Sequence, residues 1–259
     1  MSDRATPKDP APRAAAAMRP ALPKRFYAEV CVAPAASGTG YRILLDARSI
    51  RTPAKRELAV PSEELAQALA MEWRAQTDRI DPATMPLTRL VNTAIDGVAG
   101  RELEVRADIV KYAGSDLLCY FAPEPAALAE RQRRGWSPVH QWAGERFGAR
   151  PMLAEGIMPV EQDAAMLGRL AASLDAYDAF VLAALHVVTT LTGSALLALA
   201  LADGRLDAAS AWSLAHIDED FQIEQWGADA EATARRGHRW CEMQSAARLI
   251  ALVSGSPVR

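Results

Sequence analysis

The sequence lacks the short motifs that mark the common enzyme classes. No GxGxxG opens a helix after a strand, and GxxxxGK[ST], HExxH and GxSxG are all missing. These absences exclude a standard dinucleotide fold, a P-loop nucleotide site, a zincin protease and an α/β-hydrolase nucleophile. An enzyme built on this chain would need an unconventional nucleophile or metal cage.

The sequence also has few cysteines and a small net charge. Cys31, Cys119 and Cys241 lie far apart and form no CxxC pair, so we expect no disulfide framework, no zinc site and a reducing compartment. The chain has 29 Lys and Arg against 32 Asp and Glu, a formal net charge of −3. A chain without a basic excess has no field to hold a polyphosphate, so nucleic acid is not an expected partner.

The longest uncharged run, residues 179–202, is long enough to cross a bilayer. Threonines and a histidine interrupt it, and its flanks are Asp178 and Asp203 instead of Lys, Arg or an aromatic belt. The Thr-Gly-Ser sequence in its middle provides a helix stop followed by a helix N-cap. We therefore expect two buried helices joined near Gly193, and no membrane insertion.

The composition divides the chain into three parts. Residues 1–24 are rich in Ala, Pro and Arg and lack aromatic residues, which predicts a disordered tail. Residues 25–84 contain short segments rich in aromatic and β-branched residues with turn signals between them, which predicts a β-rich domain with one helix after Ser62. Residues 85–259 carry mostly helical periodicity, which predicts a second, helical domain.

Strands followed by helices, without βαβ alternation, are typical of the α+β class. We predict a small N-terminal antiparallel β domain followed by a larger all-helical C-terminal domain. The helical periods fall at residues 86–98, 101–113, 126–147, 160–174, 177–191, 194–202, 207–226 and 229–253. Pro138 should break or bend the third of these helices.

An acid-rich segment is the most unusual feature of the helical part. Residues 216–231 contain neither Lys nor Arg, and their acids are Asp218, Glu219, Asp220, Glu224, Asp229 and Glu231. Three explanations fit this density of carboxylates. They are an internal ion pair with an arginine such as Arg235 or Arg236, a surface that binds a partner protein, and a metal site.

Helical geometry singles out Glu219 within this segment. On one continuous helix over residues 207–226, a rotation of about 100° per residue places Glu219 between Trp212, Ile223 and Trp226. Its acidic neighbours on both sides turn away from this apolar stripe. A carboxylate among tryptophans is costly unless it is paired or used.

The metal explanation uses His216 and Asp220, which stand four residues apart on one helical face, with Glu219 nearby. Helices produce such spacing by chance, and a metal cage needs further ligands. A metal-dependent helical enzyme that uses these three residues stays an alternative, and a general protein-binding adaptor is another.

Three residues lie near the predicted boundary between the β-rich part and the helical part of the chain, namely Trp73, Arg89 and Asn92. Trp73 continues the four-residue period of Leu65 and Leu69, so we expect it to pack between the domains. The prolines between Trp73 and Arg89 stiffen the link. We expect structural, interdomain roles for Trp73, Arg89 and Asn92.

A collinear series of short words runs from residue 24 to residue 252. The words are Lys24-Arg25-Phe26-Tyr27, Leu45-Asp46-Ala47-Arg48, Thr52-Pro53-Ala54-Lys55, Glu72-Trp73, Met85-Pro86-Leu87-Thr88-Arg89-Leu90, Asn92-Thr93-Ala94-Ile95-Asp96, Asp116-Leu117-Leu118-Cys119-Tyr120, Gly193-Ser194, Asp218-Glu219, Gln222-Ile223-Glu224 and Trp226-Gly227. In this order they resemble the family of assembly chaperones that bind the α subunit of the F1-ATPase, the catalytic sector of ATP synthase.

The resemblance implies a non-enzymatic chaperone, which binds the unassembled α subunit transiently until the β subunit displaces it. We expect a monomer without cofactor or metal. The resemblance also favours the acid-rich block as the client-binding site. The residues expected to bind the client are Glu219, Glu224, Asp218, Gln222, Trp226 and Asp229. We expect the protein in the bacterial cytoplasm, with the mitochondrial matrix as the alternative.

Overall fold

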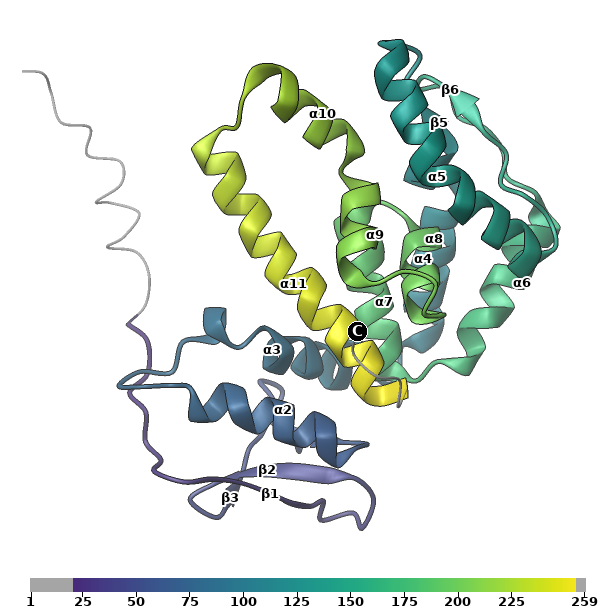
Figure 1. Ribbon diagram of the computed structural model, residues 1–259. Coiled ribbons are helices and arrows are strands. Elements are labelled where there is room, and N and C mark those ends of the chain that lie inside the picture. Colours follow the sequence, from purple (N-terminus) through teal and green to yellow (C-terminus); the bar gives the residue numbers. More distant parts are fainter. Residues whose placement is uncertain (1–20, 255–259) are drawn as a thin grey trace, which may run out of the picture.

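The computed structural model describes residues 21–254 as a small sheet region and a larger helical region (Figure 1). This arrangement confirms the α+β class with an N-terminal antiparallel sheet. Most of the expected tail, residues 1–20, lies outside the described residues. The predicted C-terminal bound of the tail, residue 24, is too late in the chain. Lys24 pairs with Arg79, and the N–H of Ile80 donates to the Pro23 carbonyl at 2.9 Å.

The sheet is built around a β-hairpin. Strands β1 (Val30–Pro34) and β2 (Tyr41–Leu45) pair antiparallel, and β3 (Arg48–Ser49) and β4 (Ala59–Val60) both pair with β2. Gly40 in the hairpin loop has a φ of +80°, and a Cβ there would lie 2.5 Å from the Val60 carbonyl oxygen. Only glycine fits this close approach, so Gly40 fixes how the hairpin meets β4.

Helix α2 (Glu63–Arg74) covers the sheet and positions the next helix. Its N-terminus is capped by Ser62, as the sequence predicts, and Leu65 and Leu69 on its inner face are fully buried. The carboxylate of Glu72 accepts hydrogen bonds of 2.9 and 2.8 Å from the N–H groups of Leu87 and Thr88. Glu72 therefore caps the following helix from a distance, because that helix has no cap of its own.

The link and the helical region complete the chain. The elements are η1 (Pro82–Thr84), α3 (Pro86–Thr93), the π-helical η2 (Ala94–Val98), α4 (Glu102–Gly114), η3 (Leu117–Cys119), β5 (Tyr120–Phe121), α5 (Ala126–Phe147), β6 (Ala154–Glu155), α6 (Ala164–Ser173), η4 (Leu174–Ala176), α7 (Ala179–Thr192), α8 (Ala195–Ala202), α9 (Ala208–Ala215), α10 (Ile217–Trp226) and α11 (Ala230–Ser254). Helix α7 lies at the centre, in contact with α4, α8 and α11.

The uncharged run folds as the two buried helices that the sequence predicts. Helix α7 ends at Gly193, whose φ is +70°, and the Ser194 hydroxyl accepts the N–H of Leu197 at 3.0 Å to begin α8. Most side chains of both helices are buried. Among residues 21–254, no helix combines the length and the apolar character that a membrane crossing requires.

The sequence predicts a break or a bend at Pro138, and α5 continues through Pro138 without a break. Pro138 lies on the exposed side of α5, whereas Trp136, Val139 and His140 next to it are buried. Packing on both sides of the proline therefore holds the helix together despite the lost N–H. The parallel pair β5–β6, with Tyr120 opposite Ala154, carries no strand signal that we detected in the sequence.

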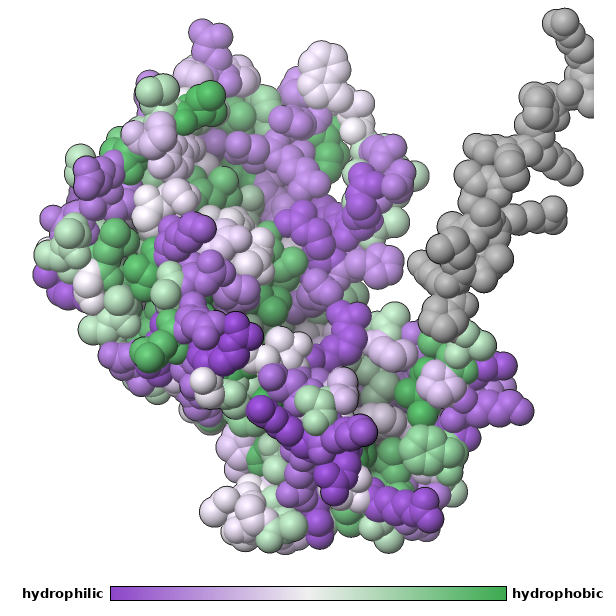
Figure 2. Space-filling view, turned by 180° about the vertical axis from the view of Figure 1, so that it is seen from behind, coloured by the Kyte–Doolittle hydropathy of each residue, from purple (hydrophilic) through white to green (hydrophobic). Residues whose placement is uncertain are grey.

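Helix α11 joins the two regions. Its C-terminal part packs against α2 and α3, and the Ser62 hydroxyl donates to the Leu252 carbonyl at 3.1 Å. Seen from behind, the sheet region is the smaller mass at lower right and the helical region the larger mass at upper left (Figure 2). The N-terminal part of α11 extends beyond this junction, away from the sheet (Figure 1).

Candidate functional site

Helix α10, residues 227–229 and the first half of α11 form an arm that projects from the helical region (Figure 1). We call residues 217–241 the acidic arm. Most of its residues are exposed or half-buried, and only Ile217 at its base is buried. From behind, the side that carries the arm is mostly hydrophilic (Figure 2). All six expected client-binding residues lie on this arm.

The base of the arm is fixed to α5 by a buried amide. The side chain of Gln132, which is completely buried, donates from Nε2 to Asp218 at 2.6 Å. Its Oε1 accepts the N–H of Ala122 at 2.7 Å. Because both ends of this amide are used, Gln132 holds Asp218 in one orientation.

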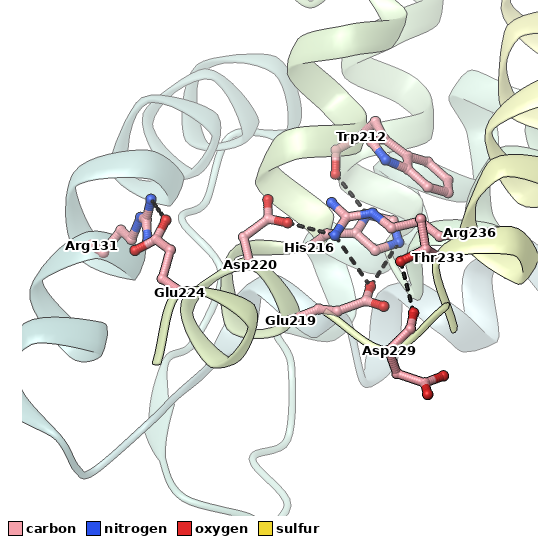
Figure 3. A network of polar contacts seen from close by, with 9 residues as sticks. All are labelled: Arg131, Trp212, His216, Glu219, Asp220, Glu224, Asp229, Thr233 and Arg236. Carbon is pink, nitrogen blue, oxygen red and sulfur yellow. Dashed lines mark hydrogen bonds and ion pairs between the residues drawn. The ribbon is translucent and has the colours of Figure 1, made fainter. Parts of the chain in front are cut away.

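An arginine of α11 joins the two helices of the arm (Figure 3). The guanidinium of Arg236 lies 2.5 Å from a carboxylate oxygen of Asp220 and 4.0 Å from one of Glu219. Asp220 is therefore the tight partner and Glu219 the loose one. The internal ion pair considered from the sequence exists, but Asp220 carries it and Arg235 pairs instead with Glu231 on its own helix.

The single helix predicted over residues 207–226 is interrupted at His216, between α9 and α10. The His216 side chain is 5% exposed and its ring stacks on Trp212 with centroids 3.9 Å apart. The ring Nδ1 is 2.7 Å from the Trp212 carbonyl, an acceptor, so Nδ1 carries the proton and donates it. The backbone N–H of His216 bonds to the Ser213 carbonyl at 3.3 Å instead of the Trp212 carbonyl that a continuous helix would use, and α9 ends there.

The break overturns the predicted apolar stripe around Glu219. Trp212 belongs to α9, Trp226 at the end of α10 is 88% exposed, and Ile223 is only half-buried. The Glu219 side chain is 39% exposed and its carboxylate lies 3.8 Å from His216 Nε2. Glu219 thus stands in a polar, partly open place, and Asp220 faces α11 instead of turning away.

Burial lowers the pKa of His216, and the nearby Arg236 and Arg239 lower it further, whereas the bond to the Trp212 carbonyl and the charge of Glu219 act in the opposite direction. The ring is therefore neutral at pH 7. A neutral ring leaves Nε2 free as an acceptor beside Glu219, so His216 adds no positive charge to the arm.

Glu224 binds α5 through a two-pronged ion pair. Its two carboxylate oxygens accept from Arg131 at 2.7 and 2.8 Å, and both side chains remain about half exposed (Figure 3). The hydrogen bonds from Arg131 hold the pKa of Glu224 below its usual range. Arg131 fixes the position of this carboxylate and at the same time balances its charge.

The remaining expected client-binding residues face solvent. Gln222 is exposed, and Trp226 has the most exposed aromatic ring among the described residues. Asp229 caps α11 by accepting the N–H of Ala232 at 2.7 Å. Asp229 therefore has a structural role as a helix cap, whereas Gln222 and Trp226 are exposed to solvent.

The metal explanation finds no support in the geometry. Within the described part of the chain, no group of three His, Cys, Asp or Glu side chains could hold a metal ion. His216 Nδ1 is used by the Trp212 carbonyl, and Asp220 is used by Arg236. His216, Glu219 and Asp220 therefore form a hydrogen-bonded and ion-paired cluster instead of a cage.

The residues expected between the domains make their observed contacts within one predicted domain each. The ring of Trp73 packs edge-on against Tyr27, and its backbone carbonyl accepts the Tyr27 hydroxyl at 2.7 Å. Arg89 on α3 pairs with Glu242 on α11 at 2.8 Å. The Oδ1 of Asn92 is buried without a hydrogen-bond partner among the described residues.

Sequence reasoning missed an open groove of about 1130 Å³ beside α11. Its wall is formed by the loop between α8 and α9 together with Trp240, Gln244 and Arg248 of α11, and Glu72 and Leu87 lie at the end near the sheet region. No sequence signal marks it, because its walls come from segments far apart in the chain.

Comparison with known proteins gives concordant matches. Residues 24–144 match the family model described as ATP12 chaperone protein. Over 202 residues the chain is 24% identical to Protein atp12, mitochondrial, of Schizosaccharomyces pombe, which covers 73% of this chain and 69% of that protein.

Solved structures match over nearly the whole chain. Atp12 from Paracoccus denitrificans, at 42% identity, has a TM-score of 0.84 and covers 89% of this chain and 98% of that chain, and a point mutant of the same protein gives the same values. The Atu1473 protein of Agrobacterium tumefaciens, at 47% identity, has a TM-score of 0.86 and covers 94% of this chain and 91% of that chain.

Proposed function

The chain belongs to the ATP12 chaperone family, and we propose that it binds the unassembled α subunit of F1-ATPase, prevents its aggregation and passes it to the β subunit during ATP synthase assembly. The observation that carries this proposal is the match at 42% identity along almost the whole of a solved Atp12 chain. The client itself comes from the sequence resemblance, in which the ordered words extend from residue 24 to residue 252.

The proposed task follows from the physical problem of assembly. A subunit that has not met its partner exposes an apolar and polar interface, which is an aggregation hazard until it is covered. A folded chaperone can cover that surface by mass action and leave when a tighter partner arrives, so neither nucleotide hydrolysis nor a cofactor is needed. We therefore propose a non-enzymatic chaperone that acts as a monomer in the bacterial cytoplasm.

We place the client on the acidic arm. Gln132, Arg131 and Arg236 hold the carboxylates of Asp218, Glu224 and Asp220 in fixed positions. Fixed groups lose little conformational freedom when a partner binds. The side chains of the arm that remain accessible to a client are those of Glu219, Gln222, Glu224 and Trp226. Large aromatic rings and well-held charges are the residue types that dominate protein interfaces.

Co-expression with the cognate α subunit, followed by affinity purification, tests the partnership. We expect the α subunit to co-purify and to be released when the β subunit is added. Light scattering of isolated α subunit, with and without the protein, tests protection. An unrelated aggregating protein is the control: equal protection of both clients would favour a general adaptor, and no protection of the α subunit at any stoichiometry would refute the proposal.

A further inference from the structure

Exposed apolar side chains gather in one loop far from the acidic arm. Among residues 21–254, nine large hydrophobic side chains are exposed, and four of them lie within residues 152–158. We call this segment the apical loop. Single exposed apolar residues are common on protein surfaces, but a cluster marks a surface that a partner covers. Figure 1 shows β6, which belongs to this loop, at the outer edge of the helical region on the opposite side from the arm.

The apical loop is held at its base by hydrogen bonds. Gln162, whose side chain is 5% exposed, accepts the N–H of Met152 and donates to the Met152 carbonyl, both at 2.9 Å. The N–H of Gly156 donates to the Phe121 carbonyl at 2.9 Å, next to the parallel pairing of β5 with β6. Hydrogen bonds from buried groups therefore fix the backbone of the apical loop, although its large apolar side chains remain exposed.

The tip of the loop presents its side chains to solvent. Ile157 is 95% exposed and Met158 is 73% exposed, with Met152 and Leu153 about half exposed below them. Gly156 turns the chain with a φ of +79°, and a Cβ there would meet nothing within 4 Å, so the turn itself is what requires glycine. Methionine adapts its shape to varied apolar partners.

The segment around the tip carries acidic residues and no basic ones. Residues 151–163 contain Glu155, Glu161 and Asp163 and neither Lys nor Arg. Arg133 of α5 lies 3.6 Å from Glu155, but the Glu155 side chain is still 67% exposed. An apolar tip between acids complements a segment in which apolar residues alternate with or are flanked by Lys or Arg. The same acids oppose binding to an anionic lipid surface.

We propose that the apical loop is a second client-contact surface, which takes a segment of the unassembled α subunit that carries apolar residues flanked by Lys or Arg. This inference rests on the proposed function, because it assigns a second surface to the same client. Ile157 and Met158 are the anchors, and Glu155 and Glu161 select the basic flanks. A client held at the arm and at the loop together is bound more tightly than by either surface alone.

Site-specific cross-linking in the full chain tests the proposal directly. A photoreactive amino acid replaces Ile157, Trp226 or Leu103, the last being a 77% exposed residue on α4 that serves as control. Each variant is irradiated with isolated α subunit. We expect cross-links to the α subunit from positions 157 and 226 and none from position 103.

The alternative results separate the two proposals. Cross-links from position 226 but not from position 157 overturn the apical loop and leave the proposed function intact. Cross-links from neither position overturn both. A cross-link from position 157 to a second copy of this chain also overturns the inference, because it makes the loop a self-association surface.

Substitutions then measure what the loop contributes. The double variant Ile157→Ser with Met158→Ser removes two apolar anchors without touching the core, so we expect an unchanged melting temperature and a Kd for the α subunit raised at least about tenfold. Leu103→Ser should leave the Kd unchanged. Glu161→Lys should weaken binding as well, whereas Glu64→Lys on the remote helix α2 should not. An unchanged Kd in the double variant refutes the proposal.

Discussion

The buried helix pair α7–α8 and the acidic arm are both helical, but different forces hold them. In α7–α8 most side chains are buried against neighbouring helices, and the turn between them is fixed by Gly193 and Ser194. In the arm most side chains face solvent, and the helices are fixed by ion pairs and hydrogen bonds from Arg131, Gln132 and Arg236.

This difference predicts which substitutions the fold tolerates. Burial of apolar area provides most of the folding free energy, so changes in α7–α8 should unfold the protein. Exposed ion pairs contribute about 0 to 1 kcal/mol each, so changes in the arm should leave the fold intact. The arm can therefore carry residues chosen for a partner at little cost in stability.

The largest expected effect comes from the buried pair. Leu185 of α7 is completely buried, and Leu185→Ala leaves a cavity that the close-packed neighbours cannot fill. We expect a loss of about 2 to 5 kcal/mol in the free energy of unfolding, measured by urea denaturation. Leu103→Ala, at an exposed position of α4, should change it by less than about 0.5 kcal/mol. Equal losses in the two variants would contradict the burial of α7.

The second effect is a pH dependence at the N-terminus of α8. Asp116 is fully buried and accepts the N–H groups of Leu118 and Leu196. Burial outweighs these bonds and raises the pKa of Asp116 to about 6 from 3.8. The folded protein thus holds the proton more tightly than the unfolded chain does. The stabilisation is complete below about pH 4 and is lost as the pH rises through about 6.

Comparison of wild type with Asp116→Asn isolates this contribution. The wild type should gain up to about 3 kcal/mol over the variant between pH 7 and pH 4. Asp207 provides a control of opposite sign, because the N–H of Ser210 lowers the pKa of its exposed carboxyl. The advantage of wild type over Asp207→Asn should shrink as the pH falls. A wild-type advantage over Asp116→Asn that does not vary with pH would rule out this titration.

The sequence predicts the buried pair well because its signals are local. The Thr-Gly-Ser sequence specifies a helix stop and a helix N-cap, and a long uncharged run predicts burial in the core. The same reasoning located the hairpin, the Ser62 cap and the bounds of α5. At Pro138, where the sequence predicts a break or a bend, α5 does not break, because the neighbouring buried residues outweigh the local preference.

The arm was harder to predict because long-range contacts determine its geometry. The acid-rich segment was visible in the sequence, but a helical wheel assumes one continuous helix and cannot foresee the interruption at His216 between α9 and α10. Nor does the sequence say which acid pairs with Arg236, because that choice depends on how α10 lies against α11. The sequence carries no signal for the exposure of the apical loop, because its apolar side chains are exposed only where no other segment of the described chain packs over them.

A smaller effect sharpens the comparison within the arm itself. Arg236 joins α11 to α10 and is 20% exposed, whereas Arg235 is 63% exposed and pairs with Glu231 on its own helix. We expect Arg236→Ala to cost about 1 kcal/mol at most and to accelerate hydrogen exchange of the α10 amides. Arg235→Ala should alter neither. Equal exchange rates in the two variants would show that the Asp220 ion pair does not hold the arm.

The smallest effect on stability and the sharpest on function are expected at Glu219. Its carboxylate is 39% exposed, with the neutral His216 ring at 3.8 Å and the Arg236 guanidinium at 4.0 Å, so Glu219→Lys removes only weak contacts, and Arg236 keeps Asp220. We expect a melting temperature close to that of wild type, with a loss of at most about 1 kcal/mol. If the client binds the acidic arm, the reversed charge should abolish protection of the α subunit in a light-scattering assay. Glu224→Lys should show a weaker defect in protection, because Arg131 already balances that carboxylate. A Glu219→Lys protein that unfolds early would make Glu219 a structural residue, and one that is stable and fully protective would remove it from the client surface.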